Sequence, residues 1–166
     1  MGLKAGWTSV ASSSDGTKLV AVDGQDVNHG NEYIYTSGDS GATWTPHGTQ
    51  QFLYCVASSS DGTKLVAVVG QEGYIYTSSD SGATWNKTGT QQFWLSVASS
   101  ANGTNLVAGS DNYLYTSSDS GATWTQRGAE RHWQSVASSA DGTRLFAVSA
   151  NTTANPYIYT STGPVP

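Results

Sequence analysis

The chain has 166 residues, a formal net charge of −5 and only 11% charged residues. Solubility therefore depends on Ser, Thr, Gly, Asn and Gln, a composition that is unusual for a cytosolic enzyme and favours a secreted protein. The acidic balance argues against nucleic acid and anionic membranes as partners, because both need clustered lysine and arginine. No apolar run approaches the ~20 residues of a membrane span, and the start MGLKAG lacks the apolar region of a signal peptide. Cys55 is the only cysteine, which excludes an internal disulfide.

The sequence consists of nearly four copies of one repeat. The motif VASS begins at Val10, Val56, Val97 and Val136, so its copies are 46, 41 and 39 residues apart. Periods near 40 residues are typical of propellers and repeat arrays. A single domain of four units follows, with approximate bounds 7–52, 53–93, 94–132 and 133–166.

Each unit predicts four short antiparallel strands, with a period of two and no helical stripe. The first strand, as at 94–100, is followed by a turn, here Asn102-Gly103 and in the preceding unit Asp61-Gly62. The glycine of this turn supplies the positive φ of a tight hairpin. The second, KLVAV at 18–22, is apolar enough for burial on both faces. The third, YIYTS at 33–37, places two tyrosines on one face and an isoleucine on the other. The predicted fold class is all-β, a β-propeller of four-stranded blades.

An eight-residue motif joins the third and fourth strands. It reads SGDSGATW at 37–44 and SSDSGATW at 78–85 and 117–124, and the fourth strand, ATWT, is expected to begin inside it. Its aspartate can accept several backbone N–H groups across a turn, and its glycine relieves backbone strain. Its tryptophan is expected to fill space between neighbouring blades.

The pattern S-x-D-x-G-x-T-W resembles the Asp-box of BNR repeats, found in sialidase-like propellers, sortilin-type receptors and photosystem II assembly factors. The resemblance covers essentially the whole chain. It implies that the box is structural and lies on the side of the ring away from the usual binding site. The residues to which this applies are Ser37, Asp39, Gly41, Thr43, Trp44, Ser78, Asp80, Gly82, Thr84, Trp85, Ser117, Asp119, Gly121, Thr123 and Trp124.

The fourth unit departs from the pattern. After Ser161 comes TGPVP, which has neither aspartate nor tryptophan and whose prolines cannot donate to a sheet. The outer strand of this unit is therefore predicted to be missing. A monomeric four-bladed ring, a piece of a longer array and a homodimer completing an eight-bladed ring all remain open. Rings have about 4–8 blades, and since Asp-box propellers usually have more than four, the homodimer is favoured.

Strand order places the loops on two faces. The first-to-second turns and the boxes lie on one side, which we call the turn face. The other side, the loop face, consists of the second-to-third loops and the linkers between units: 23–32, 69–73, 109–112, 149–156, 46–52, 87–93 and 126–132. The copies diverge on the loop face, which also holds all three histidines, so a binding site is expected there.

Aromatic rings beside amides predict lectin-like recognition of a glycan, because sugar C–H surfaces stack on rings while hydroxyls bond to amides. Tryptophans open three of the units next to linker glutamines. Packing of these tryptophans between inner strands is the alternative. The candidate ligand-binding residues are Trp7, Trp94, Trp133, Gln51, Gln92, Asp26, His29, Glu72, Asp111 and Arg131.

Enzymatic chemistry has little support in the sequence. GDSG at 38–41 echoes the nucleophile motif of trypsin-like proteases, but the turn explains each of its residues. A sialidase needs a cluster of arginines, whereas the loop face offers only Arg127 and Arg131. Other glycoside hydrolases need two carboxylates about 5–10 Å apart, which acidic loops can supply.

The overall prediction is a non-enzymatic binding module without a cofactor, whose partner is a glycan or a protein surface. A structural or protein-interaction propeller is the alternative, and a glycoside hydrolase ranks third. No metal site is predicted, because solvated loop acids explain Asp23, Asp26 and Glu32 better than a calcium ion does.

Overall fold

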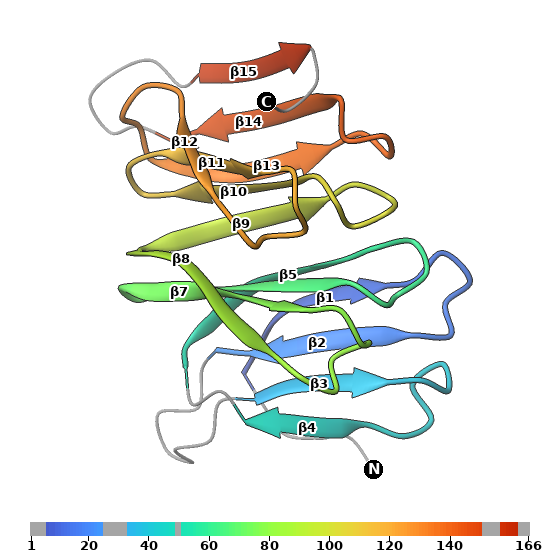
Figure 1. Cartoon of the computed structure of the whole chain (residues 1–166). Coiled ribbons are helices and arrows are strands. Elements are labelled where there is room, and N and C mark those ends of the chain that lie inside the picture. Colours follow the sequence, from blue (N-terminus) through green and yellow to red (C-terminus); the bar gives the residue numbers. More distant parts are fainter. Residues whose placement is uncertain (1–5, 25–32, 49–50, 151–156, 163–166) are drawn as a thin grey trace.

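The structure is a computed structural model that describes residues 6–24, 33–48, 51–150 and 157–162. Within these ranges the chain forms β-strands in four antiparallel sheets and no helix. It follows that no helix of the described ranges is long and apolar enough to span a membrane. Each sheet is one blade, and the blades follow one another in chain order (Figure 1). The predicted all-β fold of repeated antiparallel blades is confirmed.

In the described ranges three blades have four strands and the last has three, always in the order of the chain. Blade 1 contains β1 (Trp7–Ser12), β2 (Leu19–Asp23), β3 (Tyr33–Ser37) and β4 (Thr45–Gly48). Blade 2 contains β5 (Leu53–Ser58), β6 (Leu65–Val69), β7 (Gly73–Ser78) and β8 (Asn86–Gln92). Blade 3 contains β9 (Trp94–Ser99), β10 (Leu106–Ser110), β11 (Leu114–Ser117) and β12 (Thr125–Arg127). Blade 4 contains β13 (Trp133–Ser138), β14 (Arg144–Ser149) and β15 (Tyr157–Thr162).

The first strands of successive blades pack on one another. β1 contacts β5, β5 contacts β9, and β9 contacts β13. No comparable packing joins blade 4 to blade 1 in the described part of the chain, where the two blades lie at opposite ends of the stack (Figure 1). The four blades therefore form an open series and not a closed ring.

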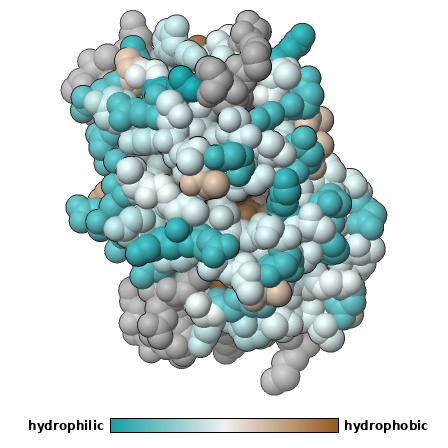
Figure 2. Space-filling view, in the orientation of Figure 1, coloured by the Kyte–Doolittle hydropathy of each residue, from teal (hydrophilic) through white to brown (hydrophobic). Residues whose placement is uncertain are grey.

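The hydrophobic core lies between the blades, in one cluster for each pair of neighbours. Between blades 1 and 2, for example, Val20, Val22 and Ile34 pack against Leu53 and Val56. The second strands of the two middle blades, β6 and β10, are buried along their whole length. Their near-continuous apolar sequence is what a strand covered on both faces requires. Figure 2 shows an outer surface in which hydrophilic and neutral residues predominate.

The SxDxGxTW turns have the same hydrogen bonds in all three copies. In the first copy Asp39 Oδ1 accepts bonds from the Ser37 hydroxyl at 2.7 Å and from the Thr43 backbone N–H at 2.8 Å. Asp39 Oδ2 accepts a bond from the Thr43 hydroxyl at 2.6 Å. The turn also bonds to the neighbouring hairpin, because the Ser40 N–H donates to the Thr17 carbonyl at 2.9 Å. The two kinds of turn therefore lie on one face, as predicted.

Two details of these turns differ from the prediction. The fourth strands begin after the tryptophan, at Thr45, Asn86 and Thr125, and not at ATWT. The reason is that the preceding threonine N–H is bonded to the aspartate and is unavailable to the sheet. Positive φ is also not confined to glycine, since Ser40, Ser81 and Ser120 have φ of 58°, 60° and 60°.

The glycine of each SxDxGxTW turn is predicted to be essential for stability. Gly82 has φ +89°, and a Cβ there would lie 2.6 Å from Thr36 Cγ2 of the preceding blade. Gly82→Ala should lower the free energy of unfolding by about 1–2 kcal/mol or more, because an L side chain is strained in this region. Gly38→Ala is the control in chemical denaturation, since nothing lies within 4 Å and serine occupies the same position in the other copies. An equal loss in both variants would contradict the assignment.

The turn aspartates are predicted to make the fold sensitive to acid. Hydrogen bonds from the Thr43 and Ser37 side chains and the Thr43 backbone lower the pKa of Asp39 from 3.8 to about 2, and Asp15, Asp80, Asp119 and Asp141 behave alike. Below pH 4 the unfolded chain binds protons that the folded chain does not, so the melting temperature should fall between pH 4 and pH 2.

Replacing a turn aspartate with asparagine removes its titration while keeping the geometry of the turn. Hydrogen bonds from Ser59 and Thr63 hold the pKa of Asp61 well below its usual range. At the same place in blade 3, Asn102 accepts bonds from the Ser100 hydroxyl at 2.8 Å and the Thr104 N–H at 2.9 Å without a charge. Asp61→Asn should therefore fold and show a weaker dependence of melting temperature on pH. An unchanged dependence would mean that this carboxylate is not a source of the acid sensitivity.

Candidate functional site

A polar pocket opens on the loop face between blades 2 and 3. It has a volume of about 320 Å³ and is lined by Glu72, Gln91, Gln92, Phe93, Asp111 and Asn112. Three of the predicted ligand-binding residues, Glu72, Gln92 and Asp111, thus lie together. They come from the turn after β6, the end of β8 and the loop after β10, so the pocket requires both blades.

Hydrogen bonds within its loops and linker fix the shape of this pocket. The Asp111 N–H donates to the Phe93 carbonyl at 3.0 Å, which ties the loop of blade 3 to the linker before it. The Gln91 side chain donates to the Glu72 carbonyl. Glu72 itself has φ +39° in the tight turn between β6 and β7. Such a conformation is sparsely populated for a residue other than glycine, and it is often found at binding sites.

The side chains around the pocket offer both acceptors and donors. The Asn112 amide donates to Asp111 Oδ1 at 3.0 Å and so orients that carboxylate. Nearby, the Tyr113 hydroxyl donates to Glu130 Oε2 at 3.3 Å, and the charge of Glu130 raises the pKa of Tyr113. Phe93 is 40% exposed and adds an apolar surface beside the polar groups. The pocket lining contains no lysine or arginine, so it is suited to a neutral ligand rich in hydroxyl groups.

Gln91, Phe93 and Asn112 were not among the predicted ligand-binding residues, although Gln91 precedes the predicted Gln92 in the same linker. Strand alternation offered a signal for Phe93, because adjacent residues of an extended segment point to opposite sides. Since Trp94 begins a core strand and points inward, Phe93 has to point outward. The position of Asn112 gave no comparable signal, because a loop has no such period.

Two of the predicted ligand-binding tryptophans are in the core. Trp94 is 0% exposed and Trp133 is 2% exposed, and each packs in the cluster between its blade and the preceding one. Trp94 Nε1 donates to the Gly73 carbonyl at 3.0 Å. Neither indole offers a face to a ligand, so packing between inner strands, the alternative stated above, is the role that the structure shows.

The remaining predicted residues do not line this pocket. Trp7 is 40% exposed and begins β1, on the face of blade 1 that no other described blade covers, with its ring 5.1 Å from that of Tyr35. Arg131 lies at the border of the pocket, where its backbone N–H donates to the carbonyl of the lining residue Asn112 at 2.7 Å. Its guanidinium is 5.1 Å from the centre of the Tyr157 ring. Gln51 is half-buried in the linker before β5. Asp26 and His29 lie outside the described residues.

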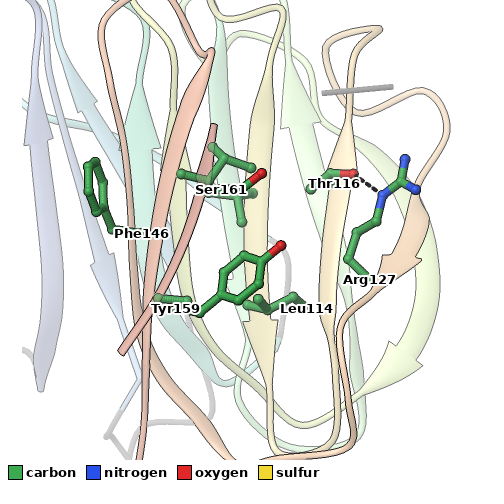
Figure 3. A pocket seen from close by; sticks show the side chains of 9 residues that line it. Leu114, Thr116, Arg127, Phe146, Tyr159 and Ser161 are labelled. Atoms are coloured by element: carbon green, nitrogen blue, oxygen red, sulfur yellow. Dashed lines mark hydrogen bonds between the residues drawn. The ribbon is translucent and has the colours of Figure 1, made fainter. Parts of the chain in front are cut away.

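A second cavity lies between blades 3 and 4 and is mainly apolar. It has a volume of about 220 Å³, and its lining includes Leu114, Thr116, Arg127, Leu145 and Tyr159. Figure 3 shows Arg127 and Thr116 joined by a hydrogen bond, 3.1 Å long, on the blade 3 side. Phe146 points away from this group in the same view.

The second cavity differs from the equivalent place between blades 2 and 3. There, Trp124 of blade 3 donates to the Thr88 hydroxyl of blade 2 at 3.3 Å and packs in the cluster between these blades. Arg127 occupies in blade 3 the position of Thr88 in blade 2, and no described residue of blade 4 takes the place of Trp124 beside it.

The described residues contain no group of three or more His, Cys, Asp or Glu side chains that could hold a metal ion. The calcium alternative of the sequence involves Asp26 and Glu32, which lie outside the described ranges.

The fold and its repeats define the chain as a set of β-propeller blades, and solved structures agree. A GH74 enzyme from Niastella koreensis is 20% identical, with a TM-score of 0.75 over 95% of this chain and 28% of that one. A GH74 xyloglucanase from Xanthomonas campestris is 17% identical, with a TM-score of 0.73 over 95% and 29%. The computationally designed protein Ika4 is 11% identical, with a TM-score of 0.72 over 98% and 94%.

These similarities show the fold and nothing finer. The chain spans less than a third of the length of either GH74 protein. No family model matches the sequence, and no curated protein matches it either.

Burial predicts losses of very different size when two adjacent aromatic residues are replaced. Trp94→Ala should lower the free energy of unfolding by about 3–5 kcal/mol, because it leaves a large cavity between blades 2 and 3. Phe93→Ala should cost about 1 kcal/mol or less, because Phe93 is already 40% exposed and leaves no enclosed cavity. Urea titrations of the two variants test this. A Trp94→Ala variant as stable as the wild type would contradict the assignment of Trp94 to the core.

Proposed function

We propose that this protein is a non-enzymatic binding module that recognises a neutral glycan at the pocket between blades 2 and 3. The observation that supports this most is the exposed ring of Phe93 beside two carboxylates and three amides in one pocket of about 320 Å³. Sugar rings stack their C–H faces on aromatic side chains, while their hydroxyls bond to carboxylates and amides. The SxDxGxTW turns, on the opposite face, serve in this proposal as Asp-boxes of BNR-type repeats.

The charge of the pocket narrows the ligand class. Glu72 and Asp111 are the charged groups of its lining, and the whole chain has a net charge of −5. An anionic sugar would be repelled, because no cation of the lining can compensate for its charge. A neutral oligosaccharide meets no such cost, and carboxylates are strong acceptors for its hydroxyl groups.

Binding to an oligosaccharide array, followed by calorimetry with the best neutral ligand, tests the proposal. Phe93→Ala should raise the dissociation constant by about 3- to 10-fold, which corresponds to the free energy of one aromatic contact. Phe93→Tyr retains the ring and should bind like the wild type. Phe146→Ala is the control, because Phe146 is 44% exposed but lies in blade 4, outside the pocket.

Three results would contradict this function. They are no binding to any neutral glycan, binding that Phe93→Ala leaves unchanged, and release of reducing sugar from the bound ligand. The last would favour a glycoside hydrolase that uses Glu72 and Asp111, since two carboxylates are the usual requirement of that reaction.

A protein-interaction propeller is the second candidate. The observation in its favour is that Phe93, Tyr54 and Tyr157 are all more than a third exposed and all lie close to the loop face. Aromatic residues of this kind are enriched at protein interfaces. Loss of a protein partner in Phe93→Ala, with no glycan bound by the wild type, would support it over the lectin-like function.

A further inference from the structure

Every pair of neighbouring blades is joined by the same two surfaces. We call the surface that a blade turns to the next blade its forward face, exemplified by Val66, Val68 and Ile75 of blade 2. The surface turned to the preceding blade is its backward face, exemplified by Trp94 and Val97 of blade 3. These five residues belong to one buried cluster, and the clusters between blades 1 and 2 and between blades 3 and 4 are formed largely by apolar residues at equivalent positions.

The end of the series at blade 4 presents an uncovered forward face. Phe146, Val148 and Ile158 are 44%, 39% and 73% exposed. The residues at the same positions of blade 2 are at most 1% exposed: Val66, Val68 and Ile75. Accordingly β14 is buried only at alternate residues, whereas β6 and β10 are buried throughout.

The other end, at blade 1, presents an uncovered backward face. Val10 is 72% exposed, whereas its counterparts Val56, Val97 and Val136 are between 5% and 9% exposed. Trp7 is 40% exposed, although its ring meets Tyr35 edge-on at 5.1 Å just as the buried Trp94 meets Tyr115 at 5.0 Å. The two ends are therefore the two complementary halves of one interface.

We propose that a second copy of this chain covers both ends, the forward face of each blade 4 packing on the backward face of the other chain's blade 1. Two identical joints would then close a ring of eight blades. This goes beyond the proposed glycan site, which lies between blades 2 and 3 and is complete within one chain.

The backbone hydrogen bonds between blades extend to this joint. Ser14 N–H donates to the Ser60 carbonyl, Ser60 N–H to the Ala101 carbonyl, and Ala101 N–H to the Ala140 carbonyl, all at 2.7 Å. This series advances one blade at each step and always in the same direction. In the proposed ring its next bond runs from Ala140 N–H to the Ser14 carbonyl of the second copy.

The space beside the turn-face glycines also distinguishes covered joints from the uncovered one. A Cβ on Gly62 would lie 2.7 Å from Lys18 Cβ of the preceding blade, and Gly103 meets Lys64 at the same distance. Gly16, the counterpart in blade 1, has nothing within 4 Å of that position. The residue of blade 4 at the position of Lys18 is Arg144, which is exposed. Arg144 would cover Gly16 of the second copy.

Charge at the joint is complementary as well. Across the joint between blades 1 and 2, Asp61 is stabilised as a carboxylate by Ser59 and Thr63, and the charge of Lys18 acts in the same direction. In the proposed joint the Arg144 guanidinium of one chain takes the place of Lys18 and faces Asp15 of the other. The pairing of a cation with an acidic turn that is present between blades 1 and 2 is thus repeated at the proposed joint.

The number of copies follows from the geometry of propellers. A forward face fits a backward face and not a second forward face, so the contact is head-to-tail and must close on itself or form a filament. Rings typically have about 4–8 blades. Two copies of four blades reach the upper end of that range, whereas three copies exceed it. We therefore commit to a closed dimer.

Light scattering coupled to size-exclusion chromatography of the full chain tests this proposal. The wild type should have about twice the chain mass of 17.4 kDa at concentrations down to a few micromolar, since tight joints persist there. Val10→Asp and Ile158→Asp should each reduce the mass to 17.4 kDa, because each places a charge in both joints. Tyr54→Asp is the control on an exposed residue away from the ends, and it should leave the dimer intact.

A mixture of the two variants tests the direction of the contact. Val10→Asp retains an intact forward face and Ile158→Asp an intact backward face, so an equimolar mixture should regain dimer through a single joint. Circular dichroism should show both variants folded, because both positions are more than 70% exposed within one chain.

Several results would overturn the proposal. One is a wild type that stays at 17.4 kDa up to about 100 µM, which would leave the end faces to further blades of the same polypeptide or to another partner. A filament of indefinite mass would overturn closure. A dimer lost in only one of the two aspartate variants would indicate contact between like faces.

Discussion

Packing of one sheet against the next is the interaction on which the rest of this structure depends. A four-stranded sheet of this sequence has two apolar faces, and water would contact both if it stood alone. Stacking covers them in pairs, and for this reason Leu65–Val69 and Leu106–Ser110 can be buried from end to end. Burial of this kind is the main favourable term in folding. The low charge of the chain is compatible with it, because almost no ionised side chain has to be placed between blades.

The two faces of the stack divide stability from recognition. On the turn face the aspartates bond within their own turns, so the side chains that look most reactive in the sequence are engaged in holding the backbone. On the loop face, the pocket forms where the linker that leaves one blade meets the loop of the next. Its lining can vary with these segments while the strands below remain the same, which is a common arrangement in repeat folds.

The repeat made much of the fold predictable. The copies of VASS, the Asp-Gly turns and the alternating YIYTS strand each indicated a blade, and the missing motif after Ser161 indicated the three-stranded last sheet. The site was predictable only in part. The sequence placed Glu72, Gln92 and Asp111 on one face, but it could not show that they come from adjacent blades and meet.

The tryptophans show where sequence reasoning reaches its limit. A period of two says which residues share a face of a strand, but not whether a neighbouring sheet covers that face. Trp7 and Trp94 open their units in the same way, yet one is 40% exposed and the other fully buried. The difference depends on whether a blade precedes them. Likewise, the positive φ of Ser40, Ser81 and Ser120 reflects bonds to a neighbouring hairpin, which no local propensity for serine reveals.

The three-stranded blade 4 has a consequence for how the molecule opens. Each blade contacts only its neighbours, so its protection from unfolding is roughly the sum of its own strands and the interfaces it shares. Among the described residues, blade 4 has one strand fewer than the others, a cavity at its interface with blade 3 and an outer surface that no other blade covers. While no second copy covers that surface, amide protons should exchange with solvent earliest there and latest in blades 2 and 3. In such an uncovered chain, fraying would begin at β15 and advance inward one blade at a time.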